Sequence, residues 1–163
     1  MATPVVRVYS DGVFDLFHHG HGRVLEQAKK AFPNVHLVTG VHDDATVHAS
    51  KGMTVMTYHE RLQAVRHCRW VDEVMEDAPW KIDEQFIAKH RIDFVAHDGA
   101  PYPWPGTNDA DLYDVPKRMG IFIPMERTPG ISTSDLIQRV LDERVAYTAR
   151  NHDRTNHLTN AAR

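Results

Sequence analysis

The sequence has little cysteine and no long hydrophobic run. Cys68 is the only cysteine among 163 residues, so no disulfide can form within the chain, and a disulfide-built secreted scaffold is excluded. No apolar run approaches the roughly 18 residues that a membrane span requires. The N-terminal stretch MATPVVRVYSDG lacks the charged start and the apolar centre of a signal peptide. We therefore expect a cytoplasmic protein with no membrane association visible in this chain.

A strong net charge is also missing. The formal charge is −3 and the isoelectric point is near 6.4, which argues against broad binding to nucleic acid. A local basic pocket can still hold a small anion. The composition, 42% hydrophobic and 25% charged, is that of a globular protein. We expect one domain over residues 1–145 and a polar C-terminal tail over 146–163 that frays at its end.

Short β-branched or aromatic runs alternate with stretches of helical apolar spacing. Strands are expected at residues 5–9, 35–41, 92–97 and 120–124, and helices at 21–32, 60–68, 84–90 and 135–145. Capping-box patterns open two of the helices, at Thr57 with Glu60 and at Ser132 with Asp135. Each crossover is long enough for a helix, so the alternation predicts right-handed βαβ units. We expect a Rossmann-like α/β fold, with a mainly parallel sheet and helices on both faces.

The stretch FDLFHHGHGR, residues 14–23, follows the first expected strand and leads into a helix. At a helix start, backbone N–H groups and the helix dipole favour an anion, and Gly20 lets the backbone approach it closely. His18 and His21 add two side-chain donors, which favours a polyphosphate. Two alternatives stay open. One is a zinc site that includes His19, although no second ligand cluster accompanies it; the other is capping or surface histidines without a role.

Six sequence blocks follow one another along residues 7–141. They are RVYSDGVFDLFHHGH, HASKGMTV, ERLQAVRHCRWVDEV, APW, RIDFVAHDGAPY and RTPGISTSD. Their order and spacing resemble the cytidylyltransferase family of HxGH nucleotidyltransferases, and within it the branch that acts on choline phosphate. The HxGH motif is shared with other nucleotidyltransferases, whereas RTxGxST[ST]D is more specific to cytidylyltransferases. The resemblance implies a homodimeric enzyme that uses Mg²⁺ with CTP and converts phosphocholine to CDP-choline and pyrophosphate.

The implied reaction needs no nucleophilic side chain. The phosphate of phosphocholine would attack the α-phosphorus of CTP, and a phosphomonoester with a second pKa near 6 is already mostly dianionic at neutral pH. The barrier instead demands in-line positioning and cancellation of charge between two anions. Histidine, lysine, arginine and helix N-termini supply those needs.

Matching positions to the motifs of the family assigns the expected roles. The resemblance implies that His18 and His21 contact the CTP phosphates. It also implies that Lys51 bridges the phosphates of both substrates and that Arg127 helps to hold the triphosphate. Without it, Lys51 is typical of a solvated loop. Further nucleotide contacts are implied at Gly12, Phe14, Gly20, Arg69, Ser132 and Thr133. No residue is expected to ligate a metal, and His19 receives no role.

We also expect a pocket for the acceptor substrate, phosphocholine. Trimethylammonium makes no hydrogen bonds, so aromatic faces and a carboxylate recognise it. Four residues match the choline pocket of the family: Asp11, Trp80, Tyr102 and Tyr113. Each alone is compatible with a core or surface position, but together they favour choline over ethanolamine, whose primary ammonium needs more acceptors. Ethanolamine phosphate and glycerol 3-phosphate remain the alternative acceptors.

Two positions depart from the pattern of the family. Gly99 stands where the family usually has an aspartate, and Pro129 stands where a glutamate or glutamine is common. The proline falls in a loop, where we expect it to be tolerated. The lost carboxylate at Gly99 motivates an alternative of another class, a nucleotide-binding module without turnover.

Overall fold

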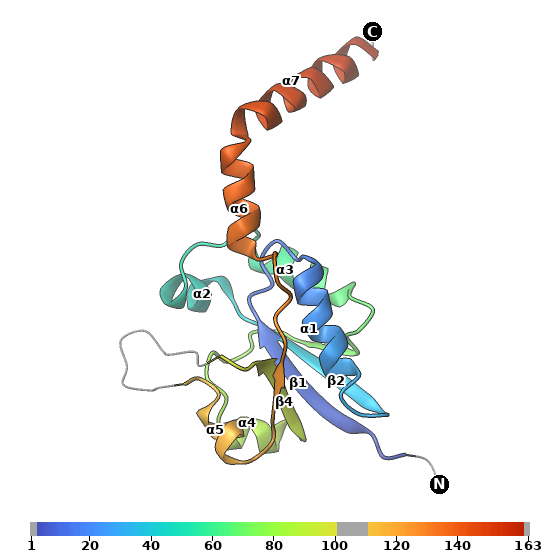
Figure 1. Ribbon diagram of the computed structural model, residues 1–163, viewed down its shortest axis with the longest axis vertical. Coiled ribbons are helices and arrows are strands. Elements are labelled where there is room, and N and C mark those ends of the chain that lie inside the picture. Colours follow the sequence, from blue (N-terminus) through green and yellow to red (C-terminus); the bar gives the residue numbers. More distant parts are fainter. Residues whose placement is uncertain (1–2, 101–110, 162–163) are drawn as a thin grey trace. The chain divides into compact units, whose positions relative to one another are not determined.

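The computed structural model describes residues 3–100 and 111–161. The chain divides into two compact units, Met1–Gly130 and Ile131–Arg163. The elements of the first unit are, in chain order, β1 Val6–Gly12, α1 His19–Lys29, β2 Val35–Val41, α2 Asp44–Ser50, α3 Tyr58–Arg66, β3 Glu73–Met75, α4 Glu84–Lys89, β4 Phe94–Asp98, α5 Asp114–Arg118 and β5 Phe122–Met125 (Figure 1). The second unit holds α6 Thr133–Asp142 and α7 Arg144–Ala161.

A five-stranded sheet in the order β3-β2-β1-β4-β5 forms the centre of the first unit. Every neighbouring pair is parallel, and β1 pairs with β2 over its whole length, from Val6 opposite Val35 to Gly12 opposite Val41. The strand order reverses between β1 and β4, which places a crevice outside the carboxyl ends of these strands. The predicted Rossmann-like parallel sheet is confirmed.

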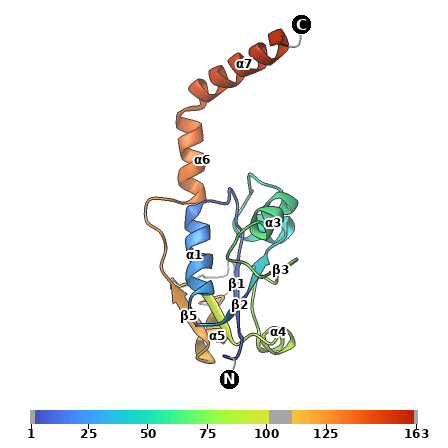
Figure 2. The ribbon, with the colours of Figure 1, turned by 90° about the vertical axis from the view of Figure 1, so that its right-hand side faces the viewer.

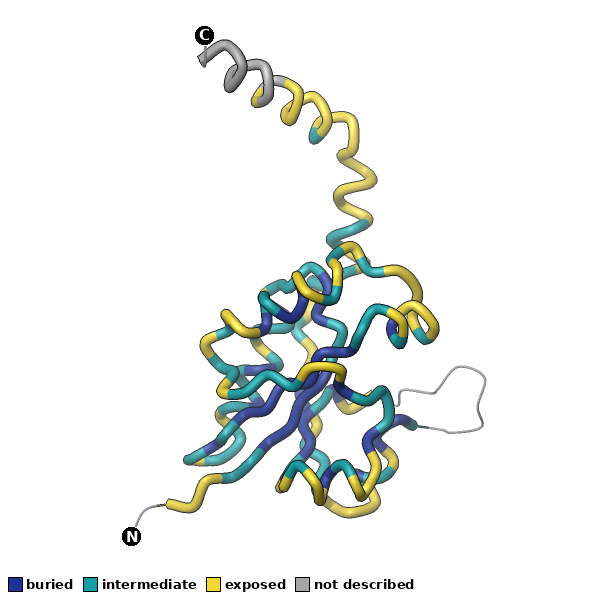
Figure 3. The backbone as a smooth tube through the Cα atoms, turned by 180° about the vertical axis from the view of Figure 1, so that it is seen from behind, coloured by how far each residue is buried: buried dark blue, intermediate teal, exposed yellow. Residues whose placement is uncertain are grey.

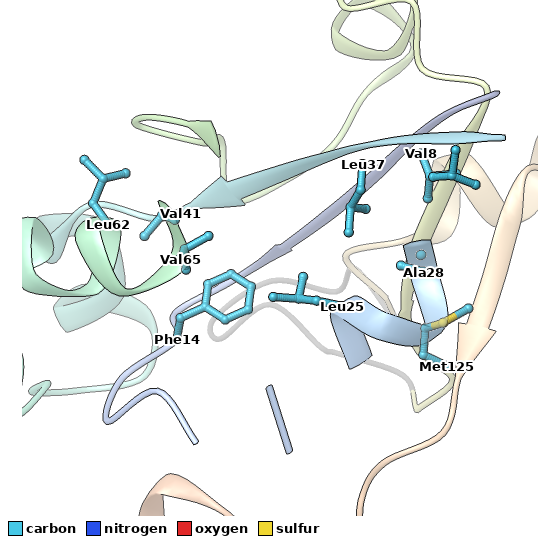
Figure 4. Close-up of a cluster of buried hydrophobic side chains, with 11 residues drawn as sticks. Val8, Phe14, Leu25, Ala28, Leu37, Val41, Leu62, Val65 and Met125 are labelled. Carbon is cyan, nitrogen blue, oxygen red and sulfur yellow. The ribbon is translucent and has the colours of Figure 1, made fainter. Parts of the chain in front are cut away.

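Helices cover both faces of the sheet. Successive side chains of β1 point to opposite faces, so each face has apolar side chains that a helix can bury. Val8 packs with residues of α1 and α3, and Figure 4 shows Phe14 between Leu25 of α1 and Val65 of α3. The next residue, Tyr9, packs on the other face with residues of α4 and α5. The central strands β1, β2 and β4 hold many of the buried residues of the unit, which are dark blue in Figure 3. The buried core holds the strand ends, and hence the crevice, in fixed positions.

The chain after β5 is attached to α1, which lies beside that strand in Figure 2. The Gln27 side chain donates to the carbonyl oxygen of Glu126 at 3.0 Å and accepts from the Glu126 N–H at 3.0 Å. Both the N–H and the carbonyl group of Glu126 are therefore bonded to one side chain of α1. These bonds hold the backbone just before Arg127 against α1.

Several elements differ from the sequence expectation. Most of the polar tail expected over residues 146–163 lies in the helix α7, Arg144–Ala161, which was not expected. Its few apolar residues give no helical pattern, and it is rich in threonine, asparagine and histidine, which are weak helix formers. The short elements β3, α2 and α5 were also not expected. Thr57 and Glu60 form the predicted reciprocal capping box, and Ser132 caps α6 by accepting from the Asp135 N–H at 3.1 Å.

Candidate active site

His18 and His21 cap the start of α1 with their own rings. Nδ1 of His18 accepts the Gly20 N–H at 3.1 Å, and Nδ1 of His21 accepts the His18 N–H at 3.2 Å. An accepting ring nitrogen carries no proton, so each neutral ring carries its hydrogen on Nε2. The rings stack with centroids 3.8 Å apart. Capping therefore uses one nitrogen of each ring and leaves Nε2–H as a donor for an anion.

Both rings are poor bases in this position. Burial lowers the pKa of His21 to about 4, and the charge of His18 adds to this effect while Asp15 opposes it. Burial also lowers the pKa of His18, followed by the charge of His19. Both imidazoles are therefore neutral donors at pH 7. Among residues 3–100 and 111–161, no group of three histidine, cysteine or acidic side chains lies together as metal ligands would, so the zinc alternative gains no support there.

We expect His21 to titrate near pH 4, as followed by its ring resonances in NMR. Its folded-state pKa lies below the unfolded value of about 6.5, so between these values the unfolded chain binds more protons. The contribution of neutral His21 to the free energy of unfolding is therefore complete above about pH 6.5 and declines as the pH falls toward 4. His21→Gln should flatten this dependence. A His21 midpoint near 6.5 would contradict the assignment.

The loop between β1 and α1 is fixed by a buried carboxylate. Asp15 accepts the N–H groups of Leu16 at 3.1 Å, Met56 at 2.8 Å and Val55 at 2.9 Å. Leu16 has a φ of 47° and Phe14 a φ of 57°, which are strained values for residues with a side chain. The Phe14 ring lies in the core, so the nucleotide contact predicted for this residue would come from its main chain.

A small pocket opens at the carboxyl ends of β1, β2 and β4. It is lined by Gly12, Val13, His42, Lys51, Trp80, His97, Leu112 and Tyr113. Gly12, Lys51, Trp80 and Tyr113 were all predicted site residues, and the structure brings them together. Tyr102 lies outside the described residues.

Asp11 is buried behind this pocket. Its Oδ1 accepts from the Tyr113 hydroxyl at 2.8 Å, and its Oδ2 lies 3.4 Å from Nε2 of His42. Burial alone would raise the pKa of Asp11, but the nearby His42, the charge of His97 and the Tyr113 hydrogen bond bring that pKa below its ordinary value. Asp11 is therefore ionised and supplies a negative charge beneath the pocket.

Trp80 presents an aromatic face to a cation. Nζ of Lys51 lies 5.5 Å from the ring centroid of Trp80, within the range of a cation–π contact. The Trp80 ring also contacts the ring of His42, with centroids 4.7 Å apart. Its indole Nε1 is buried and has no hydrogen-bond partner in the described part of the chain. The aromatic face of Trp80 and the buried carboxylate of Asp11, which were predicted to act together, thus lie at the same pocket.

Lys51 follows α2 as its C-cap and faces charges of both signs. Burial lowers its pKa, and Arg127 lowers it further, whereas Asp11 and Asp98 act to raise it. Arg127 is therefore close enough to influence Lys51 electrostatically. The two predicted basic residues, Lys51 and Arg127, thus lie near each other, as is needed to neutralise two phosphate groups.

The predicted nucleotide contacts Arg69, Ser132 and Thr133 are not among the residues that line this pocket. Arg69 is exposed after α3, with its guanidinium 5.0 Å from the ring of Trp70. Ser132 and Thr133 belong to the second unit, as the N-cap and first residue of α6. Their predicted contacts with a nucleotide stay predictions.

Sequence reasoning missed three side chains at the strand ends. His97 lines the pocket and stacks on Tyr113 with centroids 4.5 Å apart, and Asp98 ends β4. Both stand in the VAHD block, and the rule that strand ends build the site could have selected them. His42 directly follows β2, but no local pattern distinguishes it from the other histidines.

The departure at Gly99 is not forced by the backbone. A Cβ atom at this position would lie 3.4 Å from the Cβ of Pro124, an ordinary contact, and the glycine does not adopt a positive φ. An aspartate is therefore sterically possible there. Pro129 is exposed in the turn before α6.

The profile of the cytidylyltransferase-like family matches residues 9–139. A probable choline-phosphate cytidylyltransferase of Schizosaccharomyces pombe is 56% identical over 146 residues, which are 90% of this chain and 40% of the relative. An ethanolamine-phosphate cytidylyltransferase of Arabidopsis thaliana is 40% identical over 140 residues, 83% of this chain and 32% of the relative. The chain thus spans less than half the length of these two relatives.

The fold has a relative among solved structures. A lipopolysaccharide core biosynthesis protein of Thermoplasma volcanium superposes with a TM-score of 0.58 at 21% identity, over 76% of this chain and 98% of that one. In the described residues, no helix is both long and apolar enough to cross a membrane. The resemblance inferred from the sequence blocks is confirmed by the family profile and the high identities: the chain belongs to the cytidylyltransferase-like family.

Proposed function

We propose that this chain transfers the cytidylyl group of CTP to phosphocholine and releases pyrophosphate. The observation that carries the proposal is the pocket over Asp11, in which the Trp80 face and the Tyr113 hydroxyl adjoin Lys51. An aromatic face with a buried carboxylate suits a quaternary ammonium. An adjacent lysine suits the phosphate that such a substrate carries. The relative from S. pombe, whose name states this activity, supports the proposal.

The residues act by holding charge rather than by forming a covalent intermediate. Nε2–H groups of His18 and His21 donate to the CTP phosphates at the start of α1, where the helix dipole adds to their effect. Lys51 neutralises charge between the two substrates as the phosphocholine oxygen approaches the α-phosphorus. Arg127 holds the phosphates that leave as pyrophosphate.

Magnesium is proposed to arrive with CTP. The described residues offer no group of three ligands for it, so the oxygens of the triphosphate would supply most of its coordination. When bound, the ion neutralises charge on the phosphate chain. His18, His21, Lys51 and Arg127 would then neutralise the remaining charge and orient the two substrates.

A homodimer is also proposed, as the resemblance implies. Light scattering on the purified protein should give a mass of twice 18.6 kDa. A mass of 18.6 kDa at the concentrations of the activity assay would contradict the dimer without affecting the proposed reaction.

The reaction is tested most simply by phosphorus NMR. CTP, phosphocholine and Mg²⁺ should give CDP-choline and pyrophosphate in equal amounts when the protein is added. CTP binding measured by calorimetry, with no product from phosphocholine, phosphoethanolamine or glycerol 3-phosphate, would instead support the nucleotide-binding module.

Trp80→Leu should raise the KM for phosphocholine about fivefold or more, since one cation–π face contributes about 1 kcal/mol. The KM for CTP should change little, because the Trp80 face adjoins the acceptor pocket. Initial rates with each substrate varied in turn separate the two constants. An unchanged phosphocholine KM would remove Trp80 from the acceptor site.

A further inference from the structure

His42 is a buried residue to which the proposed reaction assigns no role. It directly follows β2, is 4% exposed, and lines the acceptor pocket. Arg61 donates to its carbonyl oxygen at 2.9 Å, which fixes the backbone at this point. The ring therefore has a defined place between the pocket and the residues behind it.

Both ring nitrogens of His42 face acceptors. Nδ1 lies 3.0 Å from the carbonyl oxygen of Ala78, and a carbonyl can only accept, so Nδ1 carries a hydrogen. Nε2 lies 3.4 Å from Oδ2 of Asp11, an ion-pair distance that is long for a hydrogen bond. The hydrogen bond to Ala78 on one side and the carboxylate of Asp11 on the other thus fix the orientation of the ring.

Asp11 is consequently covered at both oxygens, but only Oδ1 accepts a hydrogen bond, and the buried Oδ2 has no hydrogen-bond partner among the described residues. Tyr113 donates to Oδ1 at 2.8 Å, while His42 faces Oδ2. Asp11 itself does not line the pocket, whereas His42 and Tyr113 do. A ligand in the pocket therefore experiences the charge of Asp11 but meets its partners first. A donor N–H group would have to displace one of these side chains to reach the carboxylate.

We propose that His42 is a specificity-determining residue of the acceptor pocket, which keeps Asp11 as a buried charge rather than an available hydrogen-bond acceptor. This inference rests on the proposed function. A quaternary ammonium donates no hydrogen bond and loses nothing in such a pocket, and Val13, Leu112 and the Trp80 ring suit its methyl groups. A primary ammonium leaves its donors unsatisfied there.

Two substitutions separate the roles of the two ring nitrogens. The amide nitrogen of His42→Asn occupies the place of Nδ1 and retains the bond to Ala78, but nothing then faces Asp11. The longer His42→Gln places its amide nitrogen near the position of Nε2 and keeps a side chain in front of Asp11. His36→Gln is the matched control, because His36 also faces a carboxylate from β2, with Nε2 3.0 Å from Oε2 of Glu73, and does not line the pocket.

The readout is kcat/KM for phosphocholine divided by kcat/KM for phosphoethanolamine, at saturating CTP. We expect His42→Asn to lower this ratio about tenfold, as one released acceptor on a charged group would allow. The change should come mainly from a lower KM for phosphoethanolamine. His42→Gln and His36→Gln should stay within about threefold of the wild-type ratio.

An unchanged ratio in a folded His42→Asn protein overturns the inference, while wild-type turnover leaves the proposed function standing. If His42→Asn does not fold, Tyr113→Phe provides the second test, since it releases Oδ1 of Asp11 and should lower the ratio in the same direction. An unchanged ratio in Tyr113→Phe would then overturn the inference. Absence of turnover with either acceptor in the wild-type protein overturns the proposed function and the inference with it.

Discussion

Lys51→Ala should lower kcat by about 100-fold or more, because it removes a cation from the region between two anionic substrates. Its ammonium lies beside the acceptor pocket, over the Trp80 ring, and Arg127 is close enough to lower its pKa. Arg127 alone cannot replace it, since charge must be cancelled on both substrates as they approach. The effect should fall on kcat more than on either KM, as expected for charge that develops in the transition state.

The measurement is the rate of pyrophosphate release under saturating CTP and phosphocholine. Lys89→Ala is the matched control, because Lys89 is likewise an exposed lysine at the end of a short helix but does not line the pocket. Its turnover should match that of the wild type. Near-normal turnover in Lys51→Ala, with an unchanged melting temperature, would remove Lys51 from the mechanism.

Arg61→Met should lower the free energy of unfolding by about 3 kcal/mol or more, since it removes a buried guanidinium and leaves two main-chain carbonyl oxygens and the half-buried Asp44 without it. Arg61 is fully buried. It donates to the carbonyl oxygens of Val13 at 2.7 Å and His42 at 2.9 Å, and to Oδ1 of Asp44 at 2.8 Å. These bonds join the loop after β1, the end of β2 and the start of α2.

Urea unfolding gives the stability change directly. Arg66→Met on the same helix is the control, because its ion pair with Glu76 lies at the surface, where such pairs contribute about 0–1 kcal/mol. Since Val13 and His42 also line the pocket, Arg61→Met should weaken phosphocholine binding as well. A loss of stability no larger than that of Arg66→Met would show that Arg61 does not hold these segments together.

The sheet could be predicted from the sequence because its long strands are apolar. VHLVTGV of β2 is buried at nearly every position, and β1 alternates between two cores. The strand β3 escaped prediction because Glu73–Met75 is three residues long and half-buried throughout. The pairing of these three residues with Val38–Gly40 decides their conformation, and no local pattern records that pairing.

The site could be predicted where a local rule applied. Gly20, His18 and His21 follow a strand and begin a helix, which is enough to indicate an anion site. The histidine tautomers could not be predicted, because they follow from hydrogen bonds to particular backbone groups. His42 was missed for a related reason, since its partners Asp11 and Ala78 are distant in the chain.

A competition between equimolar phosphocholine and phosphoethanolamine, with CTP and Mg²⁺, tests whether the acceptor pocket selects a quaternary ammonium. The two nucleotide products are separated by chromatography and quantified at early times. The pocket over Asp11 predicts that CDP-choline forms in large excess over CDP-ethanolamine. An excess of CDP-ethanolamine, or CTP binding with no product at all, would contradict the account.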